Sequence, residues 1–131
     1  MNSMTEHLNS GHRRNEFHCG KEILDNYLHK QANQDVKRKL SACFVAVDIE
    51  TNLIKGYYTL ANNSIAQELI PKKLQKKLPS SYSSIPTTLL GRLAVDIRYQ
   101  SKGIGKLLLI DALKKSHEIS KKIGSFAVVV D

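Results

Sequence analysis

The residues best suited to chemistry form a glycine-containing turn at positions 100–106, between an apolar run and a helix-patterned segment. Glycines let a backbone approach an anion closely, and the first N–H groups of a helix, together with its dipole, favour negative charge. Lys102 and Lys106 either contact that anion or are simply solvated. The turn therefore predicts a phosphate-binding site made of Gln100, Ser101, Lys102, Gly103, Ile104, Gly105 and Lys106.

Two familiar glycine loops do not fit this spacing. A Walker A loop has four residues between its glycines and a Ser or Thr after its Lys, whereas one residue separates Gly103 from Gly105 here and Leu107 follows Lys106. A dinucleotide-binding loop needs a third Gly or Ala where this chain has Leu108. The pattern therefore argues against both kinds of nucleotide site.

The remaining pattern, Gln-x-x-Gly-x-Gly after an apolar strand, resembles the pyrophosphate loop of the GNAT family of acetyl-coenzyme A-dependent N-acetyltransferases. The chain is similar in particular to the subgroup that includes tRNA-acetylating bacterial toxins. The segments that carry this resemblance are Phe-His-Cys-Gly at 17–20, Leu-Asp-Asn-Tyr-Leu at 24–28, Gly-Tyr-Tyr-Thr-Leu-Ala at 56–61 and Gly-Arg-Leu-Ala-Val-Asp at 91–96.

The resemblance implies roles for the backbone of the strand and of the turn. Leu93, Ala94 and Val95 would pair with the pantetheine arm of acetyl-coenzyme A, and the amides of residues 100–106 would hold its pyrophosphate. The N–H of Val95 is the expected oxyanion donor during acetyl transfer.

The same resemblance leaves the catalytic residues unassigned. Family members usually continue past the strand that corresponds to residues 126–130 with a helix that supplies a Tyr beside the thiol, followed by further strands, whereas this sequence ends at Asp131. We therefore expect a C-terminally truncated form, whose activity is an open question. Tyr58 is a candidate to replace that Tyr as the general acid, but a Tyr on a strand is more often a packing residue.

The 131 residues, 41% of them hydrophobic, predict one domain over 1–131, with residues 1–15 flexible. Because the sequence shows neither a membrane span nor a secretion signal, we expect a cytoplasmic protein without membrane contact. Cys19 and Cys43 are too few for a disulfide framework, and Cys43 is expected to be buried on a strand. No pair of histidines has metal-ligand spacing, so no metal site is predicted.

Helical and strand patterns alternate along the chain. One face of residues 20–40 is apolar at spacings of three and four, and β-branched and aromatic residues mark the strands. The expected fold is α/β, a mixed central sheet with flanking helices, which matches a GNAT-like acyl-CoA N-acyltransferase fold lacking its last helix and strands. Its expected elements are a helix over 20–40, strands over 43–47 and 53–61, a helix over 71–78, a loop over 79–86, a strand over 87–95, a helix ending near Gly124 and a strand over 125–130.

The last strand and the charge suggest partners. Residues 126–130 are apolar and, without their usual neighbours, would leave an edge that favours homo-oligomers. A net charge of +8, clustered in lysines, either attracts polyanions or covers solvated helix faces. The resemblance favours RNA, because similar toxins acetylate the amino group of an aminoacyl-tRNA, and it implies a ribbon-helix-helix antitoxin.

Three functions therefore stay open. The first is a toxin-like N-acetyltransferase that acts on aminoacyl-tRNA, the second is a remnant that binds the cofactor without turnover, and the third is a basic RNA-binding module in which the glycine turn only redirects the chain. Arg92, on the strand before the turn, faces the acceptor or pairs with Asp96.

Overall fold

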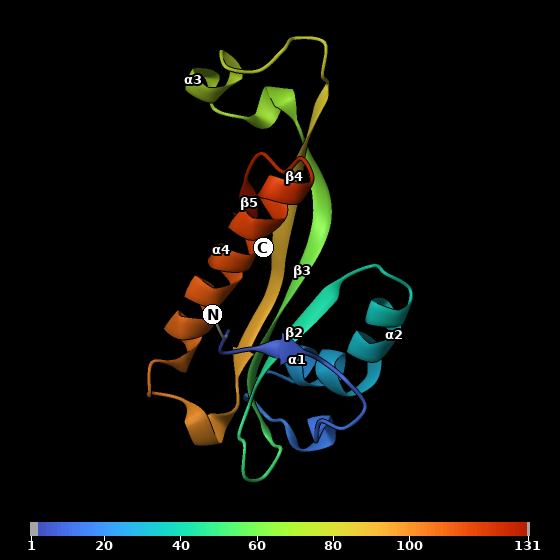
Figure 1. The fold of residues 1–131 in the computed structure, drawn as a ribbon, viewed down its shortest axis with the longest axis vertical. Helices are drawn as coiled ribbons and strands as arrows, with labels where there is room; N and C mark the ends of the chain where they lie inside the picture. Colours follow the sequence, from blue (N-terminus) through green and yellow to red (C-terminus); the bar gives the residue numbers. More distant parts are fainter. Residues whose placement is uncertain (1–2, 131) are drawn as a thin grey trace.

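A mixed β-sheet forms the centre of the computed structural model, which describes residues 3–130 (Figure 1). Its strands lie side by side in chain order, and neighbours are antiparallel except for the parallel pair β4–β5. The predicted mixed α/β architecture is thus confirmed. The strands are β1 (Glu6–His7), β2 (Ala42–Val47), β3 (Ile54–Ala66), β4 (Ser84–Val95) and β5 (Val128–Val130).

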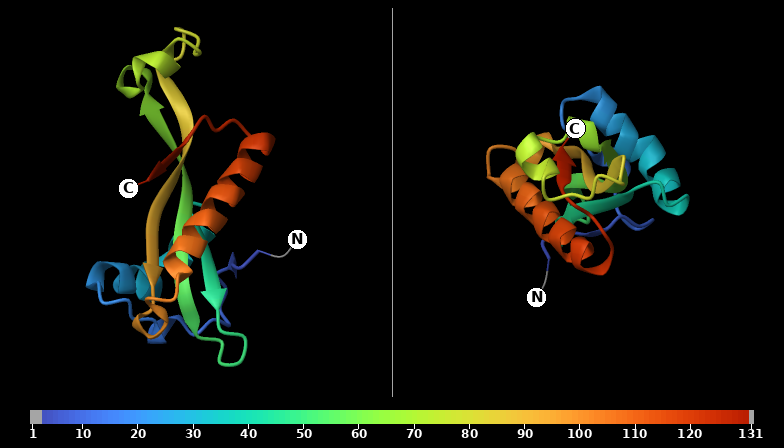
Figure 2. Two further views of the ribbon diagram at one scale, coloured as in Figure 1. Left: turned by 90° about the vertical axis from the view of Figure 1, so that its left-hand side faces the viewer. Right: turned by 90° about the horizontal axis from the view of Figure 1, so that it is seen from above.

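Helices cover both faces of the sheet. Figure 2 shows α4 (Ile104–Lys122) on one side and the helical segment of α1 (Glu22–Asn26) and α2 (Ala32–Lys37) on the other. A π-helical turn, Tyr27–Gln31, joins α1 to α2, so the predicted helix over 20–40 is one interrupted segment. No helix in the part of the chain that the structure describes is both long and apolar enough to cross a lipid bilayer.

Two apolar cores lie on opposite faces of the sheet. On the α1/α2 side, Phe17 and Leu28 pack against Tyr57. On the α4 side, Leu108 packs against Tyr58 and against neighbouring apolar side chains of β2 and β4. Alternation along each strand sends neighbouring side chains to different cores. Cys43 is buried on β2, as predicted.

A β-bulge interrupts the pairing of β3 with β4. Thr59 pairs with Arg92 and Leu60 with Leu90, so Gly91 is the extra residue of β4. A bulge shifts the alternation of a strand by one position and increases its twist. Accordingly Leu90 and Leu93 lie in the same core, on the α4 side, although three positions separate them.

The described part of residues 1–15, a segment that we expect to be flexible, has specific partners in the fold. Glu6 and His7 form β1 and pair with β2, and Leu8 belongs to the core on the α1/α2 side. Ser3 and Thr5 donate hydrogen bonds to the carboxylate of Asp111 on α4. Distant residues supply these partners, which no local pattern reveals.

The hairpin of β3 and β4 extends well beyond the helical layers and carries α3 (Lys72–Gln75) near its tip (Figure 1). Both strands are longer than predicted, because Ile65 still pairs with Ile85. The predicted helix over 71–78 shortens to one turn, and the predicted loop over 79–86 ends where β4 begins. β5 is also shorter than predicted, and it pairs with only Thr88, Leu89 and Leu90 of β4.

Candidate functional site

The predicted phosphate-binding turn lies at the start of α4. Gly103 is the N-cap residue, with a φ of 79°, and Ser101 also has a positive φ, of 63°. A side chain at Gly103 would meet no atom within 4 Å, so the space above this residue is open. The turn therefore has the left-handed backbone that favours glycine, with an open approach to the helix end.

Seven consecutive backbone N–H groups, those of residues 100–106, donate no hydrogen bond within the described residues 3–130. The first amide of this region with a partner is that of Leu107, which donates to the Gly103 carbonyl at 3.1 Å. The first N–H groups of a helix lack intrahelical acceptors, and the helix dipole adds partial positive charge there. This arrangement suits a phosphate or another anion.

The side chain of Gln100 holds the turn in place through two hydrogen bonds. Its Nε2 donates to the carbonyl of Val95 at 2.8 Å and to that of Cys19 at 2.9 Å. The side chain thereby ties the turn to the end of β4 and to the segment before α1. The backbone N–H of Gln100 stays available to a ligand while its side-chain Nε2 has a structural role, a division that the sequence did not reveal.

The start of α4 packs unusually close to the sheet. A Cβ added to Gly56 on β3 would lie 2.7 Å from Leu108 Cδ1, and one added to Gly105 would lie 3.6 Å from Val95 Cγ2. Gly56 thus permits the helix to approach the strand. This close packing fixes the amides of the turn relative to the end of β4.

The backbone of β4 beyond the bulge has an open edge. The Asp96 N–H donates to the Lys55 carbonyl at 2.8 Å, so the Asp96 amide faces β3. Amide directions alternate along a strand, so the N–H groups of Val95 and Leu93 face away from β3. Since β5 pairs with nothing past Leu90, no strand covers this edge in the described structure, although the Val95 carbonyl there already accepts the hydrogen bond from Gln100 Nε2. The N–H of Ala94 points toward β3, so it is not part of the open edge.

A buried carboxylate fixes the chain after β4. Asp96 is fully buried and accepts hydrogen bonds from the backbone N–H groups of Arg98 and His18 and from the Arg98 guanidinium. Burial alone would raise the pKa of Asp96, but these hydrogen bonds outweigh it and hold the pKa below its usual value. The suggested pairing of Asp96 with Arg92 is wrong, because Arg92 lies over the ring of Tyr27.

The tyrosines near this edge are poorly placed to act as an acid. The Tyr58 hydroxyl donates to the Asp111 carboxylate at 2.7 Å, and the Tyr57 hydroxyl donates to the Leu24 carbonyl at 2.7 Å. Both side chains are buried, and burial raises the pKa of each hydroxyl. Tyr58 is thus a packing residue, and the general acid stays unassigned.

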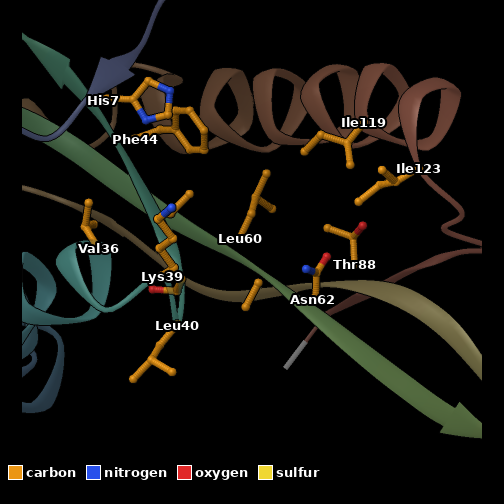
Figure 3. A pocket seen from close by; sticks show the side chains of 13 residues that line it. His7, Val36, Lys39, Leu40, Phe44, Leu60, Asn62, Thr88, Ile119 and Ile123 are labelled. Carbon is orange, nitrogen blue, oxygen red and sulfur yellow. The ribbon is translucent and has the colours of Figure 1, made fainter.

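A separate pocket of about 390 Å³ lies on the α4 side of the sheet, away from the turn (Figure 3). Ile119 of α4 and Ile123, which directly follows α4, reach toward Leu60 and Thr88 across it. His7 lies against Phe44, with 4.6 Å between the ring centroids. The pocket contains none of the predicted site residues. Among residues 3–130, no three His, Cys, Asp or Glu side chains converge to hold a metal ion.

The mixed sheet, the glycine turn that begins α4 and the open edge of β4 together define the GNAT fold. Solved structures agree with this classification. A structure of AtaT complexed with acetyl-methionyl-tRNAfMet matches 96% of this chain and 75% of its own, with a TM-score of 0.87 and 28% identity. A structure of AtaTR bound with AcCoA matches with a TM-score of 0.82, also at 28% identity, over 97% of this chain and 75% of its own.

A curated relative gives the more specific classification. The tRNA-acetylating toxin of Mycobacterium tuberculosis is 34% identical over 114 residues, which are 87% of this chain and 66% of that toxin. No protein-family model matches the chain. The chain is a relative of the GNAT-fold tRNA-acetylating toxins and spans about two thirds of the length of the curated relatives that it matches.

Proposed function

We propose that this chain binds acetyl-coenzyme A at the turn and along the open edge of β4, and transfers the acetyl group to the amine of an aminoacyl-tRNA. The observation that carries the proposal is the row of seven amides at residues 100–106 that have no acceptor within residues 3–130, next to the outward N–H groups of Leu93 and Val95. Structural relatives that bind acetyl-coenzyme A support the choice of cofactor.

The turn and the strand edge would hold different parts of the cofactor. The amides from Gln100 to Lys106 would hold the pyrophosphate, and Lys102 and Lys106 would add positive charge beside it. The open edge at Leu93 and Val95 would pair with the amides of the pantetheine arm, as one strand pairs with another. Ala94 would set the spacing between these two residues, because its own backbone faces β3.

Acetyl-coenzyme A supplies the acetyl group as a thioester, from which the attacking amine displaces the thiolate. The outward N–H of Val95 or Leu93 would stabilise the negative charge that develops on the carbonyl oxygen. The amine must arrive unprotonated and loses one proton as the amide forms, while the departing thiolate gains one.

The acceptor is proposed from relatives and from charge. The relative from Mycobacterium tuberculosis is a tRNA-acetylating toxin, and the AtaT structure contains an acetyl-methionyl-tRNA. A net charge of +8, with a lysine-rich turn at the tip of the β3–β4 hairpin, suits a polyanionic acceptor. A ribbon-helix-helix antitoxin is the partner that the toxin resemblance implies, and self-association through β5 is the proposed assembly.

The decisive experiment compares two variants of one residue. Gly103→Asn and Gly103→Asp have the same shape, and both side chains tolerate a positive φ, so they differ in charge alone. Titration calorimetry with acetyl-coenzyme A should show Gly103→Asn close to the wild type. Gly103→Asp should bind more than tenfold more weakly, a loss above about 1.4 kcal/mol, because its carboxylate repels the pyrophosphate.

Acetyl transfer is then measured with radiolabelled acetyl-coenzyme A and charged tRNA. Transfer by the wild type, reduced in Gly103→Asp, would support the enzyme. Binding without transfer would support a cofactor-binding remnant. Equal affinity of both variants for acetyl-coenzyme A, or no binding at millimolar ligand, would refute the site and leave the basic RNA-binding module.

A further inference from the structure

The guanidinium of Arg92 is a cation without an acidic partner. Its Cζ lies 3.6 Å from the centroid of the Tyr27 ring, and among residues 3–130 it forms no ion pair and donates no hydrogen bond. The hydroxyl of Tyr27 bonds instead to Asp35, at 2.9 Å. By contrast, Arg98 is paired with Asp96. All of the hydrogen-bonding capacity of Arg92 is therefore available to a ligand.

The bulge at Gly91 directs Arg92 to this position. Without the bulge, Gly91 would pair with Thr59, and Arg92 would share a face with Leu90 and point into the core beneath α4. With it, Arg92 lies on the same face as Ala94, on the α1/α2 side. The ring of Tyr27 then supports the guanidinium plane from one side, which keeps the planar group oriented.

Arg92 also adjoins the reacting end of the proposed cofactor site. A pantetheine arm that leaves the turn at residues 100–106 and runs back along β4 passes Val95 and then Leu93. Arg92 is the next residue along the strand. Its charge is felt by the nearby Cys43 and Tyr57, whose pKa values it lowers against the larger effect of burial.

We infer that Arg92 is the acceptor-phosphate site, which binds the phosphodiester nearest to the amine that receives the acetyl group. The inference rests on the proposed function, in which the acceptor is an aminoacyl-tRNA. In such an ester the carboxyl group of the amino acid carries no charge, so the backbone phosphate of the terminal nucleotides is the nearest anion. A guanidinium supported on an aromatic ring binds phosphate oxygens in pairs, with fixed geometry.

The test uses two acceptor analogues that differ by one phosphodiester. Puromycin is a stable aminoacyl-nucleoside with a free α-amine, and cytidylyl-puromycin adds one phosphodiester and one nucleotide. Their dissociation constants are measured by calorimetry with saturating coenzyme A, for the wild type, Arg92→Gln and Arg92→Lys. Lys114→Gln is the matched control, because it removes one positive charge from the exposed surface of α4, on the other side of the sheet.

The wild type and Lys114→Gln should bind cytidylyl-puromycin at least tenfold more tightly than puromycin. Arg92→Gln should reduce this ratio to below threefold, while its affinity for puromycin changes less than threefold. Arg92→Lys should give an intermediate ratio, because it keeps the charge and loses the planar fork. The Lys variant also shows whether a loss in Arg92→Gln comes from disturbed packing on Tyr27.

The outcomes separate this inference from the proposed function. Binding does not require turnover, so a tenfold ratio that depends on Arg92 supports the phosphate site even if no acetyl is transferred. Acetyl transfer with a ratio that Arg92→Gln leaves unchanged would refute the phosphate site and keep the proposed function. Equal losses for both analogues, or no binding of either at millimolar concentration, would also refute it.

Discussion

Replacing Asp111 by Asn tests how α4 is held on the sheet. Asp111 is buried, and its carboxylate accepts hydrogen bonds from Ser3 and Thr5, at 2.5 Å each, from the Tyr58 hydroxyl at 2.7 Å and from Lys115 Nζ at 3.0 Å. These four donors come from the N-terminal segment, from β3 and from α4 itself. The carboxylate therefore joins three separate parts of the fold beside the helix that carries the site.

The pKa of Asp111 gives the size of the effect. Burial alone would raise this pKa, but the four hydrogen bonds outweigh it and lower the pKa from 3.8 to about 2. Such a drop corresponds to about 2 kcal/mol of folding free energy. Because the folded pKa is the lower one, the contribution is present above about pH 4 and is lost as the pH falls toward 2. At pH 3 about half of it, roughly 1 kcal/mol, remains.

Urea unfolding at pH 7 and pH 3 measures this contribution. Asp111→Asn should lose about 2 kcal/mol at pH 7 and about 1 kcal/mol at pH 3, since the amide replaces the charged acceptor. The control is Glu118→Gln, an exposed carboxylate on the same helix, which should change stability by less than about 0.5 kcal/mol. A loss below about 0.5 kcal/mol in Asp111→Asn, or an equal loss at both pH values, would refute the reasoning.

Two further predictions concern the packing of α4 and the exposed strand edge. Gly56→Ala should lower the free energy of unfolding in urea by about 1–3 kcal/mol and weaken acetyl-coenzyme A binding, because the added Cβ would lie 2.7 Å from Leu108 and 2.9 Å from the Ala94 carbonyl oxygen. The control is Gly124→Ala, whose Cβ would meet no atom within 4 Å and which should change neither stability nor binding. Val130 on the edge strand β5 is 64% exposed, so Val130→Lys should shift any dimer seen by size-exclusion chromatography toward monomer, and a wild type that is monomeric at all concentrations would contradict self-association through β5.

Local patterns predicted most of the elements but not all of their bounds. The strand–turn–helix around residues 93–107 follows from an apolar run, two glycines and a helical apolar period, and the structure has it where expected. β3 continues five residues past its predicted end at Ala61. This extension was not predicted because it begins with the polar residues Asn62, Asn63 and Ser64. These residues are exposed, since the hairpin extends beyond the helices there.

Features that depend on distant partners could not be predicted from the sequence. The bulge at Gly91 exists only in the pairing of β4 with β3, so it was not visible in the residues 91–96. Local patterns left two partners open for Arg92, an acceptor and Asp96, because the ring of Tyr27 lies 65 positions away in the chain. The hydrogen bonds of Ser3 and Thr5 likewise depend on Asp111, more than 100 residues later.

The extra residue in β4 divides that strand into two halves that pair differently. Before Gly91 the strand forms hydrogen bonds with both β3 and β5. After Gly91 it pairs with β3 alone, and the other side of its backbone is left for another molecule. Deleting Gly91 would leave Arg92 opposite Thr59 and Leu93 opposite Tyr58, so each later side chain would keep its layer and the strand would lose only the bulge and its added twist. The extra residue therefore acts through the direction of the strand beyond it and not through the layer that each side chain enters.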